Sequence, residues 1–132
     1  PAAATFGTGD PRMVATAAHI ERWSLALYPI ASEAHPLVGR WPQDVYFGGN
    51  PWLPTSLGFA EFHFHRGDIA RGEAYLDALA RLLPEPGALP EQLERTSGAP
   101  ISCRDLTWSH AALIAAAEAR RAAIRRQAGA GS

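Results

Sequence analysis

The sequence lacks the marks of several protein classes. Its net charge is −1, so it has no basic footprint for nucleic acid or for an anionic membrane surface. No apolar run approaches the roughly 20 residues that a membrane span needs. Cys103 is the single cysteine, which rules out a disulfide within the chain, and we expect it to be a small, partly buried thiol. The 132 residues, 47% of them apolar, suit one domain with a single core.

A metal centre is also not expected. His63 and His65 lie two residues apart on a predicted helix, about 200° around its axis, so they cannot converge on one ion. The basic run over residues 120–126 fits a solvated helix end, where cations complement the helix dipole. We therefore expect neither a metal nor a cofactor, and neither a nucleic-acid partner nor a membrane partner.

The chain is predicted to be all-α, with no convincing strand pattern. Apolar residues recur at helical spacing in four segments, and each segment follows a residue that can cap a helix. We expect the last six residues to fray. The predicted helices cover residues 11–28, 51–66, 69–83 and 106–126, with Asp10, Asn50, Asp68 and Asp105 as their caps.

Two of these helices differ in how their apolar residues are arranged. In residues 51–66 the large apolar side chains surround the whole cylinder, which is typical of a buried helix. In residues 69–83 they form one stripe, which is typical of an outer helix. Only two residues separate the two segments, so we expect an antiparallel hairpin. This alternation favours a layered α/α architecture, whereas a four-helix bundle would prefer shorter connections.

Two long connections carry the chemistry. Residues 39–52, with the sequence GRWPQDVYFGGNPW, mix arginine, tryptophan, tyrosine, aspartate and asparagine. Aromatic faces cover the C–H surfaces of a sugar, and charged forks and amides bind its hydroxyl groups. Residues 84–105 hold a second group of charged side chains, including Glu91. We expect both loops to meet at one end of the helical scaffold.

Three motifs in order resemble glycoside hydrolase family 15, the glucoamylases. They are the 39–52 stretch, LPEQ at 89–92 and RDLTWS at 104–109. The resemblance implies part of an (α/α)6 barrel of the six-hairpin glycosidase type, with about four of its helices and two active-site loops. Residues 1–132 would be a C-terminal segment of the catalytic domain, about its last third. The resemblance also favours export of the protein to the outside of the cell or to the periplasm.

The resemblance further implies hydrolysis of α-glucosidic bonds at the non-reducing ends of starch-like chains, with release of β-glucose by inversion. Glu91 matches the general base that activates water, and Asp44 would hold its loop together. The residues that match substrate-binding positions or the environment of the base are Arg40, Tyr46, Trp52, Trp108 and Gln92.

The family's general acid matches no residue here and would lie in a segment before Pro1. The expected partners are therefore an α-glucan or oligosaccharide and the remainder of the barrel, as another chain or a missing segment. Pro90 and Cys103 also depart from the family pattern. Two alternatives stay open: another family-15 activity, such as that of a glucodextranase or a trehalose-cleaving enzyme, and a noncatalytic helical fragment that binds carbohydrate. Without the rest of a barrel, we expect the 51–66 helix to be uncovered and the chain to be inactive and poorly soluble.

Overall fold

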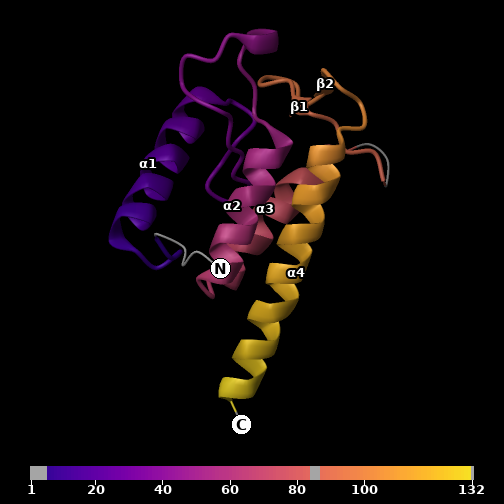
Figure 1. The fold of residues 1–132 in the computed structure, drawn as a ribbon. Coiled ribbons are helices and arrows are strands. Elements are labelled where there is room, and N and C mark those ends of the chain that lie inside the picture. Colours follow the sequence, from indigo (N-terminus) through magenta and orange to yellow (C-terminus); the bar gives the residue numbers. More distant parts are fainter. Residues whose placement is uncertain (1–5, 84–86, 132) are drawn as a thin grey trace.

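Four helices and one short hairpin make up the fold in this computed structural model (Figure 1). The structure describes residues 6–83 and 87–131. Within these ranges, no helix combines the length and the apolar character that crossing a membrane requires. The elements are α1 (Pro11–Leu27), the 3-10 turn η1 (Tyr46–Gly48), α2 (Leu53–His65), α3 (Ile69–Leu82), β1 (Gln92–Leu93), β2 (Pro100–Ile101) and α4 (Thr107–Ala130).

Two of the predicted helix starts are confirmed. The Asp10 carboxylate accepts a hydrogen bond from the backbone N–H of Arg12 at 2.9 Å, and Pro11 occupies the first turn of α1. The Asp68 carboxylate likewise accepts from the backbone N–H of Arg71 at 3.1 Å at the start of α3. Both aspartates satisfy an N–H group that lacks a partner within its helix.

The other two starts were wrong. Asn50 does not cap α2, because its side-chain amide donates to the carbonyl oxygen of Phe47 and to the side chain of Gln92 instead. Trp52 is extended and forms a β-bridge to Gln92, so α2 begins only at Leu53. At α4 the preceding residue is Leu106, whose N–H donates to the carbonyl of Leu89, and no side chain caps the helix. Backbone pairing between distant loops decides where α2 and α4 begin, and the local sequence does not reveal this pairing.

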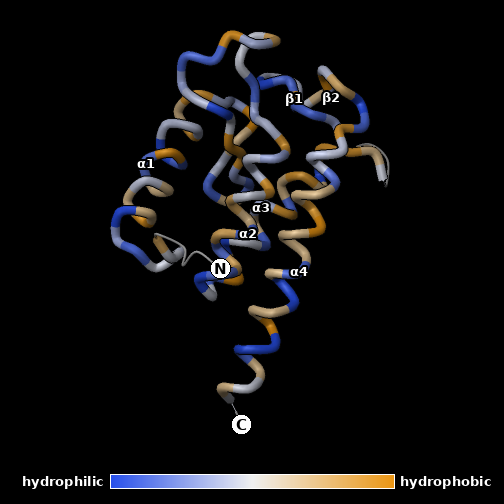
Figure 2. The backbone as a smooth tube through the Cα atoms, in the orientation of Figure 1, coloured by the Kyte–Doolittle hydropathy of each residue, from blue (hydrophilic) through white to orange (hydrophobic). Residues whose placement is uncertain are grey.

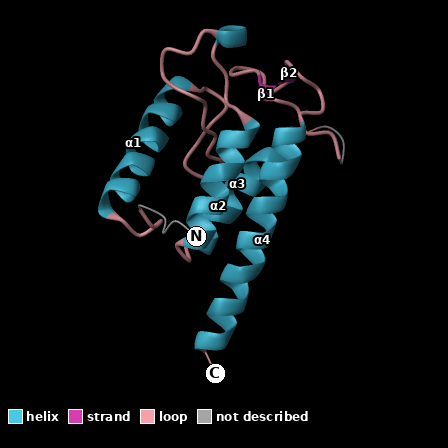
Figure 3. Cartoon of the chain, viewed as in Figure 1, coloured by secondary structure: helices cyan, strands magenta, loops and turns pink. Residues whose placement is uncertain are grey.

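The far end of α4 and the strands also differ from the predictions. α4 continues to Ala130, so residues 127–130 are helical and not frayed. The chain also contains a hairpin, in which Gln92 pairs with Ile101 and Leu93 with Pro100 (Figure 3). With two residues per strand, it is too short to give the alternating pattern by which strands are recognised.

The core sits where α2 meets α3 and α4. Figure 2 shows hydrophilic and hydrophobic residues alternating along α4. The α4 residues that reach this core are alanines, whose small side chains let the helices approach closely. The two buried clusters are Leu37, Leu53, Leu57, Ala78, Leu79, Leu89 and Leu93, and Val38, Ala60, Phe64, Tyr75, Ala116, Ala119 and Ala123.

The contrast between a buried α2 and a one-sided α3 is confirmed. On α3 the buried residues form one face, whereas on α2 they occur on more than one side. The expectation that α2 would be uncovered holds only in part, because α3 and α4 bury much of it. Phe59 and Phe62 are only partly buried, and they face α1 across an apolar cavity of about 390 Å³.

A polar cluster joins α1 to α2 and α3. One carboxylate oxygen of Glu21 in α1 lies 2.9 Å from the hydroxyl of Tyr75, 3.1 Å from Nε of Arg71 and 3.2 Å from Nε2 of His63. Burial alone would raise the pKa of Glu21, but these partners lower it to about 2. α1 is therefore held to the other helices by a charge as well as by apolar contacts.

Candidate active site

The two long connections meet at one end of the helices, above the starts of α2 and α4 (Figure 1). Backbone hydrogen bonds join them: the N–H of Leu53 donates to the carbonyl of Glu91 at 3.0 Å, and the N–H of Leu93 to that of Pro51 at 3.1 Å. The backbone N–H of Arg95 donates to the side-chain oxygen of Asn50 at 3.1 Å. The loops therefore form one paired backbone unit, and this fixes the side chains that they carry.

The Glu91 carboxylate is held at both oxygens. The indole N–H of Trp52 donates to Oε1 at 3.1 Å, and the hydroxyl of Ser102 donates to Oε2 at 2.5 Å. Partial burial on its own would raise the pKa of Glu91, but the bond from Ser102, followed by that from Trp52, outweighs it and lowers the pKa below its usual value. Glu91 is thus ionised and oriented near neutral pH.

Ser102 is a site residue that sequence reasoning missed. Its backbone is left-handed, with φ of 68°, which is uncommon for a residue other than glycine. The hairpin register places it opposite Glu91, because the next pair along the ladder is Gln92 with Ile101. A recognised hairpin would have been the signal for this contact, which spans eleven positions in the sequence.

Arg40 is paired and surrounded by rings. Its guanidinium donates from Nε and from one terminal nitrogen to the two oxygens of Asp44, each at 2.8 Å. Burial would raise the pKa of Asp44, but the bond from Arg40 and the backbone N–H of Tyr46 lower it. The guanidinium carbon also lies 4.5 Å from the ring centroid of Trp41, 4.8 Å from that of Tyr46 and 5.6 Å from that of Trp52. The second terminal nitrogen of Arg40 makes no hydrogen bond to Asp44.

Trp108 and Gln92 occupy contrasting places. Trp108 lies in the first turn of α4, is 59% exposed, and packs edge-on against Trp52 with ring centroids 4.8 Å apart. Gln92 is buried, and its side-chain oxygen accepts a hydrogen bond from the Asn50 amide at 3.0 Å. Trp108 can therefore meet a ligand, whereas Gln92 supports the loop beneath it.

The structure links all seven predicted site residues through consecutive contacts, with Asp44 and Tyr46 joined to the others through Arg40. Trp52 is at the centre, because it touches Glu91, Trp108, Arg40 and, through the backbone, Gln92. The functional roles of these residues stay predictions. The expectation of a partly buried thiol was wrong, because Cys103 is exposed. Its backbone oxygen accepts a hydrogen bond from the N–H of Glu91. Across residues 6–83 and 87–131, no group of three or more His, Cys, Asp or Glu side chains could hold a metal ion.

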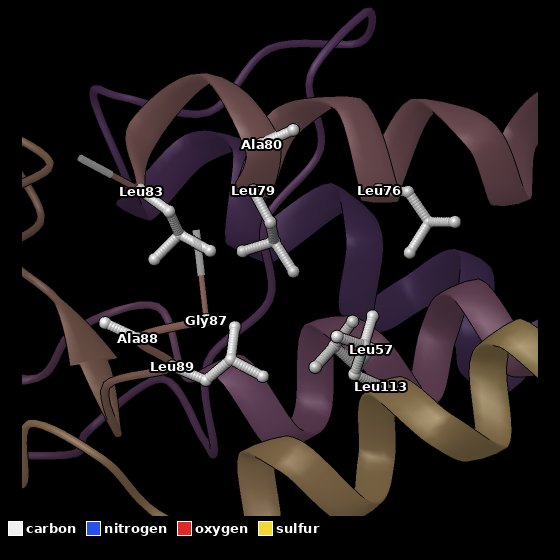
Figure 4. Close-up of a pocket in the computed structure, with 9 residues that line it drawn as sticks. All are labelled: Leu57, Leu76, Leu79, Ala80, Leu83, Gly87, Ala88, Leu89 and Leu113. Atoms are coloured by element: carbon white, nitrogen blue, oxygen red, sulfur yellow. The ribbon is translucent and has the colours of Figure 1, made fainter. Parts of the chain in front are cut away.

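A separate cavity of about 430 Å³ lies between α2, α3, α4 and residues 87–89 of the second connection (Figure 4). It is lined by aliphatic residues and glycine and holds no ionisable group, so it has no means of acid–base chemistry. The lining residues are Leu57, Leu76, Leu79, Ala80, Leu83, Gly87, Ala88, Leu89 and Leu113.

Comparison with protein sequences finds glycosidases. A family model described as glycosyl hydrolases family 15 matches residues 69–118. A glucoamylase-1 of Schizophyllum commune is 30% identical, over 67% of this chain and 23% of the relative. An uncharacterized glycosyl hydrolase of Methanocaldococcus jannaschii is 31% identical, over 80% of this chain and 18% of the relative. The chain therefore spans about a quarter or less of the length of these curated relatives.

Solved structures agree on the fold. A family-15 glucoamylase from Hypocrea jecorina superimposes with a TM-score of 0.82 at 21% identity, over 90% of this chain and 28% of that one. A glucoamylase from Hormoconis resinae gives 0.79 at 24% identity, over 88% and 28%. These matches confirm the predicted fold class, since the four helices are part of an (α/α)6 barrel.

Proposed function

Since this chain belongs to glycosyl hydrolase family 15, we propose that it supplies the general base of an inverting α-glucosidase. The substrate would be the non-reducing end of starch or of a maltooligosaccharide, and the product β-glucose. The observation that carries the proposal is the Glu91 carboxylate, which is fixed at both oxygens beside an arginine and two tryptophans.

A general base must be ionised before it can take a proton from water. The hydrogen bonds from Ser102 and Trp52 lower the pKa of Glu91 and so keep it ionised. They also leave each oxygen with lone pairs for a water molecule, because each receives a single side-chain donor in the structure. Glu91 is therefore suited to orient water for attack on an anomeric carbon.

The second carboxyl group that inversion requires would come from outside this chain. It must lie roughly 6.5–9.5 Å from the base and must be protonated. Asp44 is the other carboxylate tied to this cluster, but its bidentate bond to Arg40 lowers its pKa and keeps it ionised. We therefore assign the acid to the remainder of the barrel.

The two apolar cavities support the existence of this remainder. One lies between α1 and α2 and the other between α2, α3 and α4, and both are lined by groups that ordinary packing would cover. The two solved glucoamylases described above extend over more than three times the length that this chain matches. The complete catalytic domain, and not this chain alone, is the unit in which activity should be measured.

Within the site, Arg40 and Trp108 would bind the sugar that is cleaved. The terminal nitrogen of Arg40 that Asp44 does not use can donate to sugar hydroxyls, while the exposed ring of Trp108 can cover a sugar face. Trp52 would have two roles, because its N–H orients Glu91 and its ring packs against that of Trp108.

Glu91→Gln in the complete domain tests the proposal. Gln keeps the shape and the bonding to Trp52 but cannot accept a proton from water, so kcat should fall by roughly 10²- to 10⁴-fold with affinity for maltooligosaccharide retained. Glu61→Gln on α2 is the control, because its carboxylate pairs with His65 in the last turns of the helix. Turnover within a few-fold of the parent would exclude Glu91 as the base. Retained binding in a domain that never turns over substrate would favour a noncatalytic carbohydrate-binding role.

A further inference from the structure

Asn50 is a buried amide at the junction of the two long connections, and only 2% of it is exposed. Its side chain makes three hydrogen bonds. The nitrogen donates to the backbone oxygen of Phe47 at 2.8 Å and to the side-chain oxygen of Gln92 at 3.0 Å, and the oxygen accepts from the backbone N–H of Arg95 at 3.1 Å. Both amide hydrogens of Asn50 therefore have an acceptor within the protein.

The backbone fixes the direction in which the Asn50 amide points. An amide can be turned end for end with little change in its shape, so its hydrogen-bond partners decide its direction. The backbone oxygen of Phe47 can only accept, and the backbone N–H of Arg95 can only donate. A turned amide would place oxygen against oxygen and nitrogen against nitrogen. Asn50 therefore has one direction, and its second N–H faces Gln92.

The direction of the Gln92 amide follows from that of Asn50. Because Asn50 presents an N–H, Gln92 accepts it with its oxygen, and this leaves the N–H2 group of Gln92 on the other branch of its amide. This group is buried and has no acceptor at hydrogen-bond distance within residues 6–83 and 87–131. A buried donor without an acceptor is uncommon, because it has lost its bonds to water without replacing them. The arrangement therefore calls for an explanation.

Glu91 supplies the explanation. The N–H end of an amide favours an ionised carboxylate beside it and lowers the pKa, whereas the oxygen end raises the pKa. Burial raises the pKa of Glu91, but donors outweigh it. In order of effect, these donors are Ser102, Trp52, the backbone N–H of Cys103 and the side chain of Gln92. Gln92 thus turns its N–H2 end toward Glu91, which is the direction that the bonds of Asn50 require.

We propose that Asn50 is a positioning residue for the general base, because it fixes the Gln92 amide with its buried N–H2 group directed at the Glu91 carboxylate. This proposal rests on the function proposed above, which makes Glu91 the base. Asn50 makes no hydrogen bond to Glu91, so its effect passes through Gln92. The same side chain also holds the backbone of Phe47, so one amide joins the loop of the first connection to the surroundings of the base.

Asn50→Asp in the complete domain tests this role. Aspartate has the shape of asparagine and can still accept from the backbone N–H of Arg95, but its second oxygen is also an acceptor. The Gln92 amide should then turn, with its N–H2 group toward position 50 and its oxygen toward Glu91. The pKa of Glu91 should rise by roughly one unit. The measurement is the pH dependence of the 13C resonance of the Glu91 carboxyl carbon, assigned by its absence in Glu91→Gln. The acidic limb of the kcat/KM profile should move in the same direction.

A Gln92→Met background separates the turned amide from the charge that aspartate adds. Methionine has about the length of glutamine but no amide, so Gln92→Met alone should raise the pKa of Glu91 by roughly half a unit. In that background, Asn50→Asp should cause less than about half of the rise that it causes in the parent. Arg40, whose own pKa is raised by its bond to Asp44 and also by the charge of Glu91, is unchanged in every variant.

Two further variants complete the experiment. Gln43→Glu is the matched control, because it makes the same change from amide to carboxyl at an exposed position of the same connection. It should leave the pKa of Glu91 within about 0.2 units of the parent's value. Asn50→Ala serves where Asn50→Asp does not fold. It removes the N–H without adding a charge, so the pKa of Glu91 should rise by less, and this rise should disappear in the Gln92→Met background.

Three results would overturn the role of Asn50. They are an unchanged pKa of Glu91 in the folded Asn50 variant, an equal rise in the parent and in the Gln92→Met background, and an unchanged pKa in Gln92→Met alone. Failure of the proposed function looks different, because it appears as undiminished turnover of Glu91→Gln. The 13C resonance still reports the Glu91 carboxyl group in that case, so the titrations decide the role of Asn50 separately.

Discussion

Replacing Glu21 with glutamine should destabilise the protein in a way that depends on pH. Glu21 is 16% exposed, and one of its oxygens meets Tyr75, Arg71 and His63. Glutamine keeps the size of the side chain and can still accept a hydrogen bond, but it has no charge. The difference between the two proteins therefore isolates the contribution of the carboxylate at the junction of α1, α2 and α3.

The magnitude follows from the pKa. The folded protein lowers the pKa of Glu21 from 4.5 to about 2, against a burial effect of the opposite sign. A change of one pKa unit corresponds to about 1.4 kcal/mol, so the charge of Glu21 contributes about 3 kcal/mol to the free energy of unfolding. A group whose pKa is lower in the folded state stabilises above its unfolded pKa. The contribution is therefore complete above about pH 4.5, and it is lost as the pH falls toward 2.

Urea unfolding at several pH values from 7 to 2 measures this effect. Glu21→Gln should be less stable than the parent by about 3 kcal/mol at pH 7 and by less than about 1 kcal/mol at pH 2. Glu33→Gln is the matched control, because Glu33 also faces Arg71, at 3.5 Å, but is 81% exposed. Its replacement should change stability by no more than about 0.5 kcal/mol at any pH. A Glu21→Gln difference that stays constant from pH 7 to pH 2 would refute the electrostatic account and leave only lost packing.

Two further predictions concern the loops. Ser102→Ala removes the hydroxyl bond that lowers the pKa of Glu91, so the acidic limb of the kcat/KM profile should move to higher pH, and an unmoved limb would count against Glu91 as the base. Gly49→Ala should lower the free energy of unfolding by roughly 1–3 kcal/mol and reduce turnover, because φ is +73° and a Cβ there would lie 2.1 Å from the carbonyl oxygen of Asp44. Gly48→Ala, with φ of +89° and open space around a Cβ, carries the strain without the clash and should be milder in thermal unfolding.

The helices could largely be predicted, because their signals are local. Asp10 followed by proline, Asp68 after a glycine, and the apolar spacing within each segment need only a few neighbouring residues to be recognised. The start of α2 could not be predicted in the same way. Asn50 resembles a cap, but its amide bonds with Gln92, which lies 42 positions further along the chain.

The site likewise combines features that the local sequence predicts with features that depend on contacts between distant residues. The residue types that suit a sugar could be chosen from the two loops, and Glu91 from its resemblance to a known motif. The contact that orients Glu91 could not be predicted, because it depends on the register of a hairpin with two residues per strand. Ser102 becomes a partner of Glu91 only when that register is known.

How Glu91 is kept ionised also bears on the acid that is proposed to face it. The charge of Glu91 helps to raise the pKa of Arg40, but the guanidinium makes its two hydrogen bonds to Asp44. Glu91 is instead held ionised by the neutral donors of Ser102 and Trp52. Because these two donors are neutral, they do not cancel the negative charge of Glu91. A negative charge raises the pKa of a nearby carboxyl group, so the same arrangement that ionises the base favours the protonated form of a general acid across the cleaved bond. An inverting pair needs opposite protonation states at one pH, and with Glu91 as the proposed base, its neutral donors would favour both.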